Sequence, residues 1–201
     1  MENFEASARS EGKRILCGID EVGRGCLAGP VLAAAVVLPE GFDPTGIGDS
    51  KKLTAKQRER AYERIVAEAL SWGIGQCDAE EIDRINILRA THEAMRRALA
   101  ALSVSPDRVF VDGLPVPNLH PDCLNLIGGD SRCVSIGAAS ILAKVTRDRL
   151  LIEYDTRWPE YGFAGHKGYG AASHLAALDK HGPCPIHRRT FGPVAQQAFR
   201  F

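Results

Sequence analysis

The chain has 201 residues, and its 25 basic and 25 acidic side chains give a formal net charge of zero at neutral pH. That length suits one medium-sized domain whose core is large enough to need no disulfide or metal staple. No apolar stretch reaches 18 residues without a charge, and the polar N-terminus lacks the apolar segment of a secretory signal. These features argue against a membrane-spanning or secreted protein, and we expect a cytoplasmic one.

The cysteine pattern agrees with that compartment. No two cysteines form a C-x-x-C pair, and several stand in apolar runs, where a free thiol behaves as a small hydrophobic side chain. We therefore interpret all six as reduced thiols rather than zinc ligands or disulfides. They are Cys17, Cys26, Cys77, Cys123, Cys133 and Cys184.

Charge is unevenly distributed along the chain. From Tyr161 to Phe201 there are five basic side chains and one acidic side chain, a net charge of +4. Because the whole chain is neutral, residues 1–160 must carry −4. A basic segment on an acidic body is typical of proteins that bind an anionic partner, above all nucleic acid, although a solvated basic tail gives the same pattern.

Two short apolar runs open the predicted fold. Residues 14–20 and 31–38 are typical of buried strands, and the turn between them is short enough for antiparallel pairing. A helix is then predicted to start at Thr54, because Gln57 stands three residues later in a capping-box pattern. Residues 72–77 are predicted to form a third strand.

Helices and strands alternate in the rest of the chain. Asp78 can cap a helix over residues 79–102, and a buried strand over 108–112 ends on an acid. Interspersed elements without internal repeats predict an α/β fold, a mixed sheet with an antiparallel start covered by helices. The remaining expected elements are a short strand at 123–129, a long helix over about 131–157, a short helix at 171–181 and an irregular tail after Pro183.

Four acidic residues share one kind of position in this pattern. Asp20, Glu21, Asp112 and Asp130 each stand at or just after the end of an apolar strand, where functional groups of α/β sheets converge. Carboxylates gathered in one place repel each other, and a hard divalent cation such as Mg²⁺ or Mn²⁺ removes that repulsion. Two such ions can activate a water and stabilise the leaving oxygen, so the pattern predicts metal-dependent phosphodiester hydrolysis.

Simpler interpretations of the same acids stay open at this point. Asp112 is followed by a glycine in a common turn dipeptide, and Asp130 precedes a long helix that it can cap. Asp20 and Glu21 are neighbours, and neighbours in a regular strand point to opposite faces. Both can serve one site only if the strand stops or bulges there, which the nearby Gly23 allows.

The turn formed by Gly23, Arg24 and Gly25 follows the first pair of acids. It lacks the ending of a phosphate-binding P-loop and the spacing of a dinucleotide-binding turn. Glycines let a backbone approach a ligand closely, and Arg24 can bind a phosphate as a fork. A backbone pressed against a sugar can sense a 2′-hydroxyl, the group that distinguishes RNA from DNA. The alternative is a tight turn with a solvent-exposed arginine.

Beyond these patterns, nearly the whole chain after about Arg14 resembles the ribonuclease HII family. The first matching stretch is long and specific, and all the stretches stand in the order of the family. They are "GIDEVGRGCLAGPVLAAAVVL" (18–38), "DSKKL" (49–53), "VFVDG" (109–113), "GGDSRCVSIGAASILAKVTRD" (128–148), "YGFAGHKGYG" (161–170) and "HRRTFGPV" (187–194).

The resemblance implies a ribonuclease H-like fold, a mixed five-stranded sheet flanked by helices with a helical C-terminal region. Residues 1–13 would be a flexible tail, and residues 14–201 a single catalytic domain with a basic substrate-binding part over about 160–201. The implied activity is endonucleolytic cleavage of the RNA strand of RNA–DNA hybrids, and cleavage 5′ of single ribonucleotides in duplex DNA. The products would carry a 5′-phosphate and a 3′-hydroxyl.

The resemblance also assigns roles to individual residues. The turn of Gly23, Arg24 and Gly25 would read the 2′-hydroxyl at the RNA–DNA junction. Tyr169 would stack on the sugar beyond that junction, and Lys51 would contact the phosphate backbone. Two Mg²⁺ or Mn²⁺ ions would be held by Asp20, Glu21, Asp112 and Asp130.

Some positions depart from the family or stay ambiguous. Ala171 stands where the family usually has Thr or Ser, so if that hydroxyl contacts a phosphate, the contact is missing here. Gly137 replaces a usual alanine and should soften its helix by about 1 kcal/mol. His187, Arg188 and Arg189 can contact a phosphate backbone or anchor the C-terminal tail to the domain. Lys144 and Asp148, four residues apart, fit a helical ion pair.

Two other classes of function compete with the nuclease. One is a non-catalytic module on the same fold that binds hybrids or a sliding clamp, and the C-terminal "QQAFRF" resembles short clamp-binding peptides, unless it folds onto its own core. The other is a metal-dependent deoxyribonuclease or nucleotidyl-transferring enzyme, which has no use for a 2′-hydroxyl sensor. We expect a monomer, because no apolar stripe is left unassigned.

Overall fold

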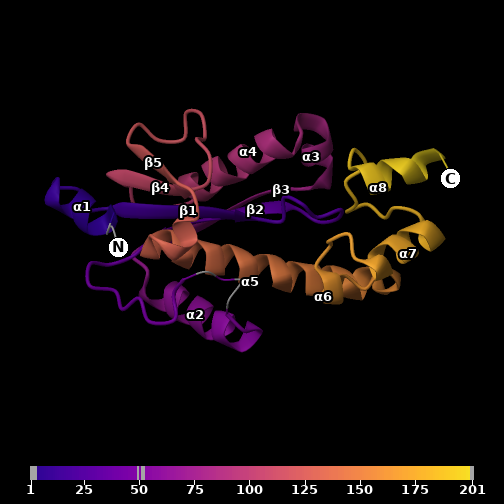
Figure 1. Cartoon of the computed structure of the whole chain (residues 1–201), viewed down its shortest axis with the longest axis horizontal. Coiled ribbons are helices and arrows are strands. Elements are labelled where there is room, and N and C mark those ends of the chain that lie inside the picture. Colours follow the sequence, from indigo (N-terminus) through magenta and orange to yellow (C-terminus); the bar gives the residue numbers. More distant parts are fainter. Residues whose placement is uncertain (1–3, 49, 51–52, 200–201) are drawn as a thin grey trace.

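The computed structural model describes residues 4–48, 50 and 53–199 of the chain. Its centre is a sheet with the strand order β3-β2-β1-β4-β5 (Figure 1). The antiparallel strands β1, β2 and β3 adjoin a parallel part, in which β4 pairs with β1 and β5. The mixed five-stranded sheet is therefore confirmed. Its strands are β1 (Leu16–Val22), β2 (Val31–Val37), β3 (Ser71–Cys77), β4 (Arg108–Asp112) and β5 (Cys123–Leu126).

Helices cover both faces of the sheet (Figure 1). One face packs against α5 (Val134–Arg157) with α2 (Ala55–Glu68) beside it, and the other packs against α3 (Ala79–Ile85) and α4 (Ile87–Ala100). No helix in this described part of the chain is long and apolar enough to cross a membrane. The shorter elements are α1 (Phe4–Ser10), η1 (Gly129–Ser131), η2 (Pro159–Tyr161), α6 (Phe163–His166), α7 (Ala172–His181), α8 (Gly192–Ala195) and η3 (Gln196–Phe199).

The central strands are apolar because both of their faces are covered. Every residue of β2 is buried. Leu32 and Ala34 belong to the core beneath α5, whereas Ala33 and Ala35 belong to the core beneath α4. Alternate side chains of one strand thus fill two cores, which explains the absence of an apolar–polar alternation in this run.

Local sequence signals set most helix boundaries. Thr54 and Gln57 form the predicted capping box at the start of α2, and Asp78 caps α3 together with Glu81. The single helix predicted over residues 79–102 is wrong, because Asn86 adopts a φ of +68° and divides it into α3 and α4. Its side chain then caps α4 by accepting a hydrogen bond from Arg89 N at 3.1 Å.

The N-terminal segment differs from the predicted flexible tail. Residues 4–10 form α1, which buries Ala8 against the sheet. Glu5 accepts hydrogen bonds from the backbone N–H groups of Val134 and Ser135, at 3.4 and 3.0 Å, and so caps the first turn of α5. A carboxylate at a helix N-terminus is favourable, and this long-range contact explains why segment 4–10 is ordered against the domain.

The start of α7 lacks a side-chain cap. Ala171 is its N-cap residue, with φ −68° and ψ 156°, nearly the same backbone geometry as the capping Thr54 at −66° and 160°. We therefore predict that Ala171→Thr stabilises the protein by about 1 kcal/mol, raising its melting temperature by ~2–4 °C. Thermal unfolding measures this, with Ala172→Thr as the control for a threonine inside the helix. An unchanged melting temperature in Ala171→Thr would contradict the prediction.

Candidate active site

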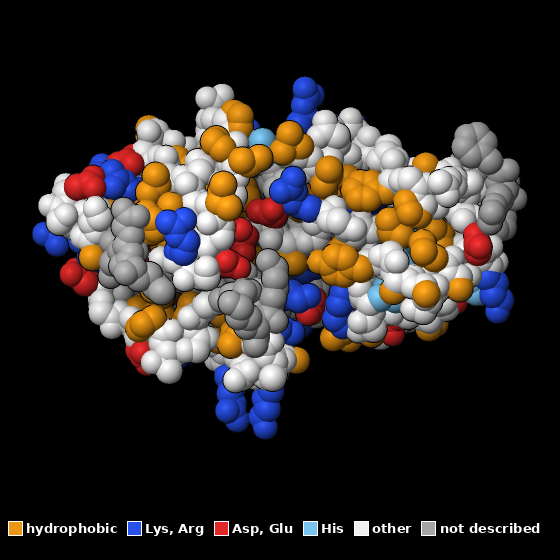
Figure 2. Space-filling model, viewed as in Figure 1, with side chains coloured by type: hydrophobic (Ala, Val, Ile, Leu, Met, Phe, Trp, Pro, Cys, Tyr) orange, Lys and Arg blue, Asp and Glu red, His pale blue; other side chains and the backbone are white. Residues whose placement is uncertain are grey.

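Sheet register brings two of the predicted acids together. The parallel pairing of β1 and β4 ends with Ile19 beside Val111, so the next residues, Asp20 and Asp112, are neighbours on the same face. Figure 2 shows acidic side chains gathered near the centre of the face in view. Asp112 is the last residue of β4, as predicted, whereas the predicted strand end at Asp20 is wrong because β1 continues to Val22.

Asp20 is the most buried of the four carboxylates. Its side chain accepts a hydrogen bond from Glu21 N at 2.7 Å and one from the Ser140 hydroxyl of α5. Burial, followed by the nearby charges of Glu21 and Asp112, raises the pKa of Asp20 to about 7. A carboxyl group with so high a pKa lies where burial and neighbouring negative charge both oppose its ionisation.

Glu21 lies next to Asp20 although β1 neither bulges nor stops there. The strand stays in register with β2 through Val22, so the two side chains leave opposite faces close to the strand end. Arg24 donates a hydrogen bond to Glu21 Oε1 at 3.2 Å. The pKa of Glu21 is nevertheless raised, chiefly by burial and also by Asp112. The charge of Asp112 therefore acts on both Asp20 and Glu21.

Asp112 links the strand end to the segment that carries Asp130. Its Oδ1 accepts a hydrogen bond from Gly129 N at 2.7 Å, which fixes η1 beside β4. Asp130, half-buried in η1, is not the N-cap of α5; that position belongs to Cys133, and Glu5 provides the cap. The capping interpretation of Asp130 is wrong, and its position next to the Asp112 contact agrees with the carboxylate site.

The donor set fits a hard divalent cation. Burial, together with neighbouring carboxylate charge, raises the pKa of Asp20 and of Glu21, and a bound cation would relieve that cost. Among the residues that the structure describes, no three Asp, Glu, His or Cys side chains already stand in a metal-ligating arrangement. Oε1 of Glu21 is instead paired with Arg24, so part of its negative charge is already compensated.

We predict a stability cost of this site in the absence of metal. The pKa of Asp20 is about 7 in the folded protein, above the ordinary aspartate value, so the folded state binds the extra proton and the free energy of unfolding falls as pH rises from about 4 to 7. Above pH 7 Asp20→Asn should be more stable than the wild type by ~1–3 kcal/mol, and the difference should shrink toward pH 4. Urea unfolding in EDTA at pH 8 and pH 5 measures it. Equal stability at pH 8 would contradict the assigned charge repulsion.

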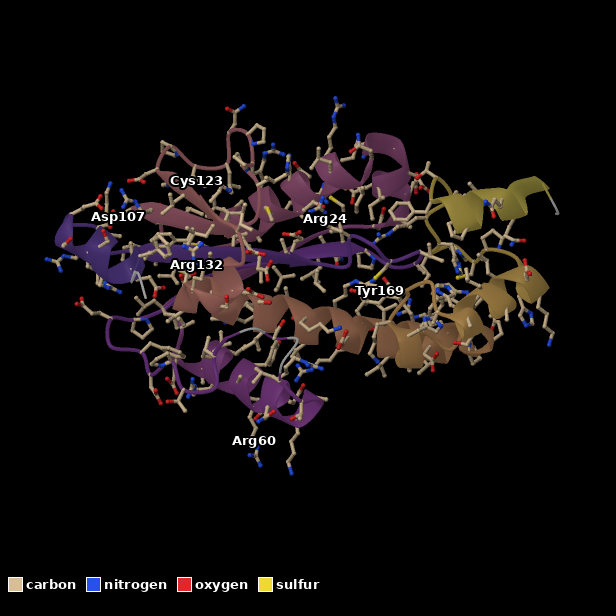
Figure 3. All side chains as sticks on the ribbon, viewed as in Figure 1. Arg24, Arg60, Asp107, Cys123, Arg132 and Tyr169 are labelled. Atoms are coloured by element: carbon tan, nitrogen blue, oxygen red, sulfur yellow. The ribbon has the colours of Figure 1, made fainter. Side chains whose placement is uncertain are left out.

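The glycine–arginine turn is packed against a buried arginine. Gly23 has a φ of +91°, and a Cβ atom there would lie 2.3 Å from Arg147 Nε. Gly25 differs, because a Cβ atom at this position would meet nothing within 4 Å. Gly23 is thus required by the fold, whereas Gly25 leaves open space on the outer side of the turn. In the view of Figure 3, Arg24 lies near the centre of the molecule.

Two fully buried arginines hold the turn from beneath. Arg188 donates to the carbonyl oxygens of Gly23, Arg24 and Gly29, at 2.6, 2.8 and 3.0 Å. Arg147, on α5, donates at 2.9 to 3.0 Å to three backbone carbonyl oxygens from two separate segments of the chain. Its acceptors are Ala28, Pro30 and Lys167.

The two interpretations of Arg188 are thereby decided. Arg188 anchors the C-terminal segment to the turn, and Asp83 accepts hydrogen bonds from Arg189 N and Thr190 N at 2.7 and 2.9 Å. Arg147 was missed by sequence reasoning, because its acceptors lie far away in the chain. The expected ion pair of Lys144 and Asp148 is present at 2.8 Å.

Tyr169 stands across from the turn in a segment bonded to it. The backbone N–H of Leu27 donates to Gly168 O at 2.8 Å, so the residue before Tyr169 is tied to the end of the turn. The tyrosine side chain is 45% exposed and lies near α6 and α7 (Figure 3). Turn and tyrosine thus border one surface. Lys51, predicted to contact the phosphate backbone, lies outside the described residues.

The fold and the carboxylates at the ends of β1 and β4 define a ribonuclease H-like protein. Comparison with known proteins identifies the family within this class. The family model of ribonuclease HII matches residues 17–194. The ribonuclease HII of Syntrophotalea carbinolica is 56% identical over 194 residues, covering 96% of this chain and 92% of that one. The ribonuclease HII of Ruminiclostridium cellulolyticum is 53% identical over 191 residues, covering 95% of this chain and 75% of that one. The chain belongs to the ribonuclease HII family, and this membership supports a ribonuclease H activity.

Solved structures agree with the fold. The crystal structure of ribonuclease H2 from Pyrococcus horikoshii has a TM-score of 0.77 and 25% identity, covering 92% of this chain and 98% of that one. The ribonuclease HII of Archaeoglobus fulgidus, solved in complex with PCNA, has a TM-score of 0.74 and 23% identity, covering 89% and 95%. The predicted ribonuclease H-like architecture is confirmed.

Proposed function

We propose that this protein is a metal-dependent endoribonuclease that hydrolyses the RNA strand of RNA–DNA hybrids. It also nicks duplex DNA 5′ of a single ribonucleotide, leaving a 5′-phosphate and a 3′-hydroxyl. One observation carries the proposal: mutually repelling carboxylates at the ends of β1 and β4 stand beside a glycine turn that is fixed from beneath by buried arginines. The site thus has an excess of negative charge that suits cations, and beside it a stretch of exposed backbone that suits a sugar.

The four carboxylates are the proposed ligands of two Mg²⁺ or Mn²⁺ ions. When bound, such ions activate a water and stabilise the leaving oxygen of a phosphodiester. Asp20 is already oriented by Ser140 and by Glu21 N, and Asp112 is oriented by Gly129 N. These contacts reduce the reorganisation needed to hold the substrate phosphate in place.

The turn and the tyrosine supply the proposed specificity. The open side of Gly25 lets the main chain approach the ribose, where backbone groups can contact its 2′-hydroxyl. Arg24 is half-exposed, and once Glu21 turns to the metal its guanidinium can bind a phosphate. Tyr169, also exposed, offers an aromatic face for the sugar beyond the junction.

Metal dependence and strand choice are tested with one labelled substrate set. An RNA–DNA hybrid, the matching RNA duplex and the matching DNA duplex are incubated with Mg²⁺, with Mn²⁺ and with EDTA. We expect cleavage of the RNA strand of the hybrid with either metal, and no cleavage of the DNA duplex or in EDTA. Equal cleavage of the DNA duplex would favour the deoxyribonuclease alternative. Binding without cleavage would favour the non-catalytic module.

We also propose a cellular location, an oligomeric state and a partner. We propose a cytoplasmic monomer that acts on ribonucleotide-containing DNA during replication and repair. A weak sliding-clamp contact through the C-terminal tail stays a prediction, since residues 200–201 lie outside the described part. Gln197 is buried and donates to Asp179 Oδ1 at 2.7 Å, so a clamp contact through this glutamine requires its release from the domain.

A further inference from the structure

A chain of buried histidines ends on the backbone of Tyr169. His187 Nε2 and His174 Nε2 are 3.0 Å apart, and His174 Nδ1 is 2.7 Å from Tyr169 O. Both imidazoles are at most 1% exposed. At its far end, the Nδ1 atom of His187 lies 3.0 Å from Cys184 N and 3.1 Å from the Cys184 thiol.

The donor at the Cys184 end and the acceptor at the Tyr169 end fix the direction of every hydrogen bond. Because the Cys184 N–H donates to His187 Nδ1, the proton of a neutral His187 stays on Nε2 and points to His174. His174 accepts it on Nε2, which leaves its own proton on Nδ1 to be donated to Tyr169 O. Burial lowers the pKa of His174, and burial with the neighbouring His174 lowers that of His187 to about 4, in agreement with two neutral rings.

A third histidine completes the support of this segment. The ring of His166 stacks on that of His174, with centroids 4.3 Å apart. Its Nδ1 accepts from Gly168 N at 3.2 Å, and its backbone oxygen accepts from Tyr169 N at 3.0 Å. The N–H and the carbonyl of Tyr169 are thus both engaged, while its ring remains half-exposed on the surface.

The surroundings of the chain are mostly aromatic and apolar. Phe163 contacts all three rings, and Tyr161 lies against His187. Apolar side chains would fill such a space without the cost of burying imidazoles that need hydrogen-bond partners. The polar chain therefore achieves something that packing alone would not: it places a directed donor on the carbonyl of one exposed tyrosine.

We propose that His174, oriented by His187, is a positioning residue that sets where the Tyr169 ring stands over the substrate. This inference rests on the proposed function, in which Tyr169 contacts the sugar beyond the junction. His174 touches neither the substrate nor the metal site. It acts through the backbone of Tyr169, whose carbonyl oxygen lies 2.7 Å from His174 Nδ1.

A matched pair of variants separates positioning from packing. In His174→Asn the side-chain amide takes the place of Nδ1 and can still donate to Tyr169 O. In His174→Gln the amide reaches the place of Nε2, keeps the contact with His187 and loses the donor to Tyr169. We expect His174→Gln to lower kcat for nicking at a single ribonucleotide by about tenfold or more, and His174→Asn by less than about threefold. Equal losses in the two variants would overturn the proposal.

A double-mutant cycle with Tyr169→Ala tests whether the effect passes through the tyrosine. If His174 acts through Tyr169, His174→Gln should have no further effect on kcat in the Tyr169→Ala background. Additive losses would overturn the proposal. Nicking by the wild type is measured in parallel: a wild type that does not nick contradicts the proposed function, whereas an active wild type with additive losses contradicts only the positioning role.

A spectroscopic readout covers the case of poor folding or low activity. In protein labelled with 3-fluorotyrosine, the ¹⁹F resonance of Tyr169, assigned through Tyr169→Phe, should move in His174→Gln and not in His174→Asn. The resonance of Tyr62 on α2 reports intact folding. If His174→Gln does not fold, His187→Asn replaces it. This variant keeps the acceptor for Cys184 N and loses the donor to His174. Its control is His187→Gln. An unmoved Tyr169 resonance in a folded variant would overturn the proposal.

Discussion

Asp20→Asn is expected to abolish RNA cleavage while leaving substrate binding nearly intact. Asparagine keeps the size of the buried side chain and can still accept from Glu21 N, but it removes the charge at the centre of the carboxylate cluster. The loss in kcat should reach ~10⁴-fold or more, since the group acts on the metal ions and not through binding alone. The Kd for a hybrid should change by less than about tenfold.

Three measurements make this result interpretable. Single-turnover cleavage gives the rate, fluorescence anisotropy gives the Kd, and thermal unfolding shows that the variant is folded. Glu68→Gln is the control, because Glu68 is an exposed acid at the end of α2, outside the carboxylate cluster. A folded Asp20→Asn protein that cleaves at the wild-type rate would contradict the assignment of the metal site.

Gly23→Ala is expected to cause the largest loss of both stability and activity in the turn. Alanine is strained at a φ of +91°, and its Cβ would lie 2.3 Å from Arg147 Nε. Arg147 cannot move away without breaking bonds to three buried carbonyl groups. We expect a loss of ~3 kcal/mol or more in the free energy of unfolding, together with a marked loss of nicking. Urea unfolding and the nicking rate measure the two effects.

Gly25→Ala is the matched comparison two residues away. Its Cβ meets no atom within 4 Å and its φ is not positive, so the free energy of unfolding should change by less than ~1 kcal/mol. Nicking should still fall, because the methyl group would occupy the space proposed for the ribose. Similar stability losses in both variants would contradict the packing of Gly23 on Arg147. Full activity in Gly25→Ala would contradict the close approach of the turn to the sugar.

Sequence reasoning succeeded where a local signal carries the information. The apolar run that ends on Asp112 predicts the end of β4, and the register of β1 with β4 places Asp20 beside it, although β1 itself continues to Val22. Thr54 with Gln57 predicts a helix start, since a capping box needs only four neighbouring residues. The family resemblance added the order of the motifs and the expected architecture.

The misses are contacts between distant parts of the chain. Arg147 resembles any polar helix residue until its acceptors at Ala28, Pro30 and Lys167 are known. Asn86 interrupts the predicted helix although the apolar stripe continues on both sides of it. The reason is that the Asn86 side chain caps the start of α4. Segment 4–10 forms α1, which is held in place by the hydrogen bonds that Glu5 accepts from the first turn of α5. The local polarity of the segment does not indicate this distant partner.

The central claim, that this site cuts at a ribonucleotide, is tested most directly by a DNA duplex with one embedded ribonucleotide. The duplex is labelled at both ends of the ribonucleotide-containing strand and incubated with Mg²⁺ or Mn²⁺, beside an all-DNA duplex and an EDTA control. We expect a single nick 5′ of the ribonucleotide with a 5′-phosphate and a 3′-hydroxyl, absent from both controls. A folded protein that binds this duplex and leaves it intact with both metals would contradict the proposed nicking activity.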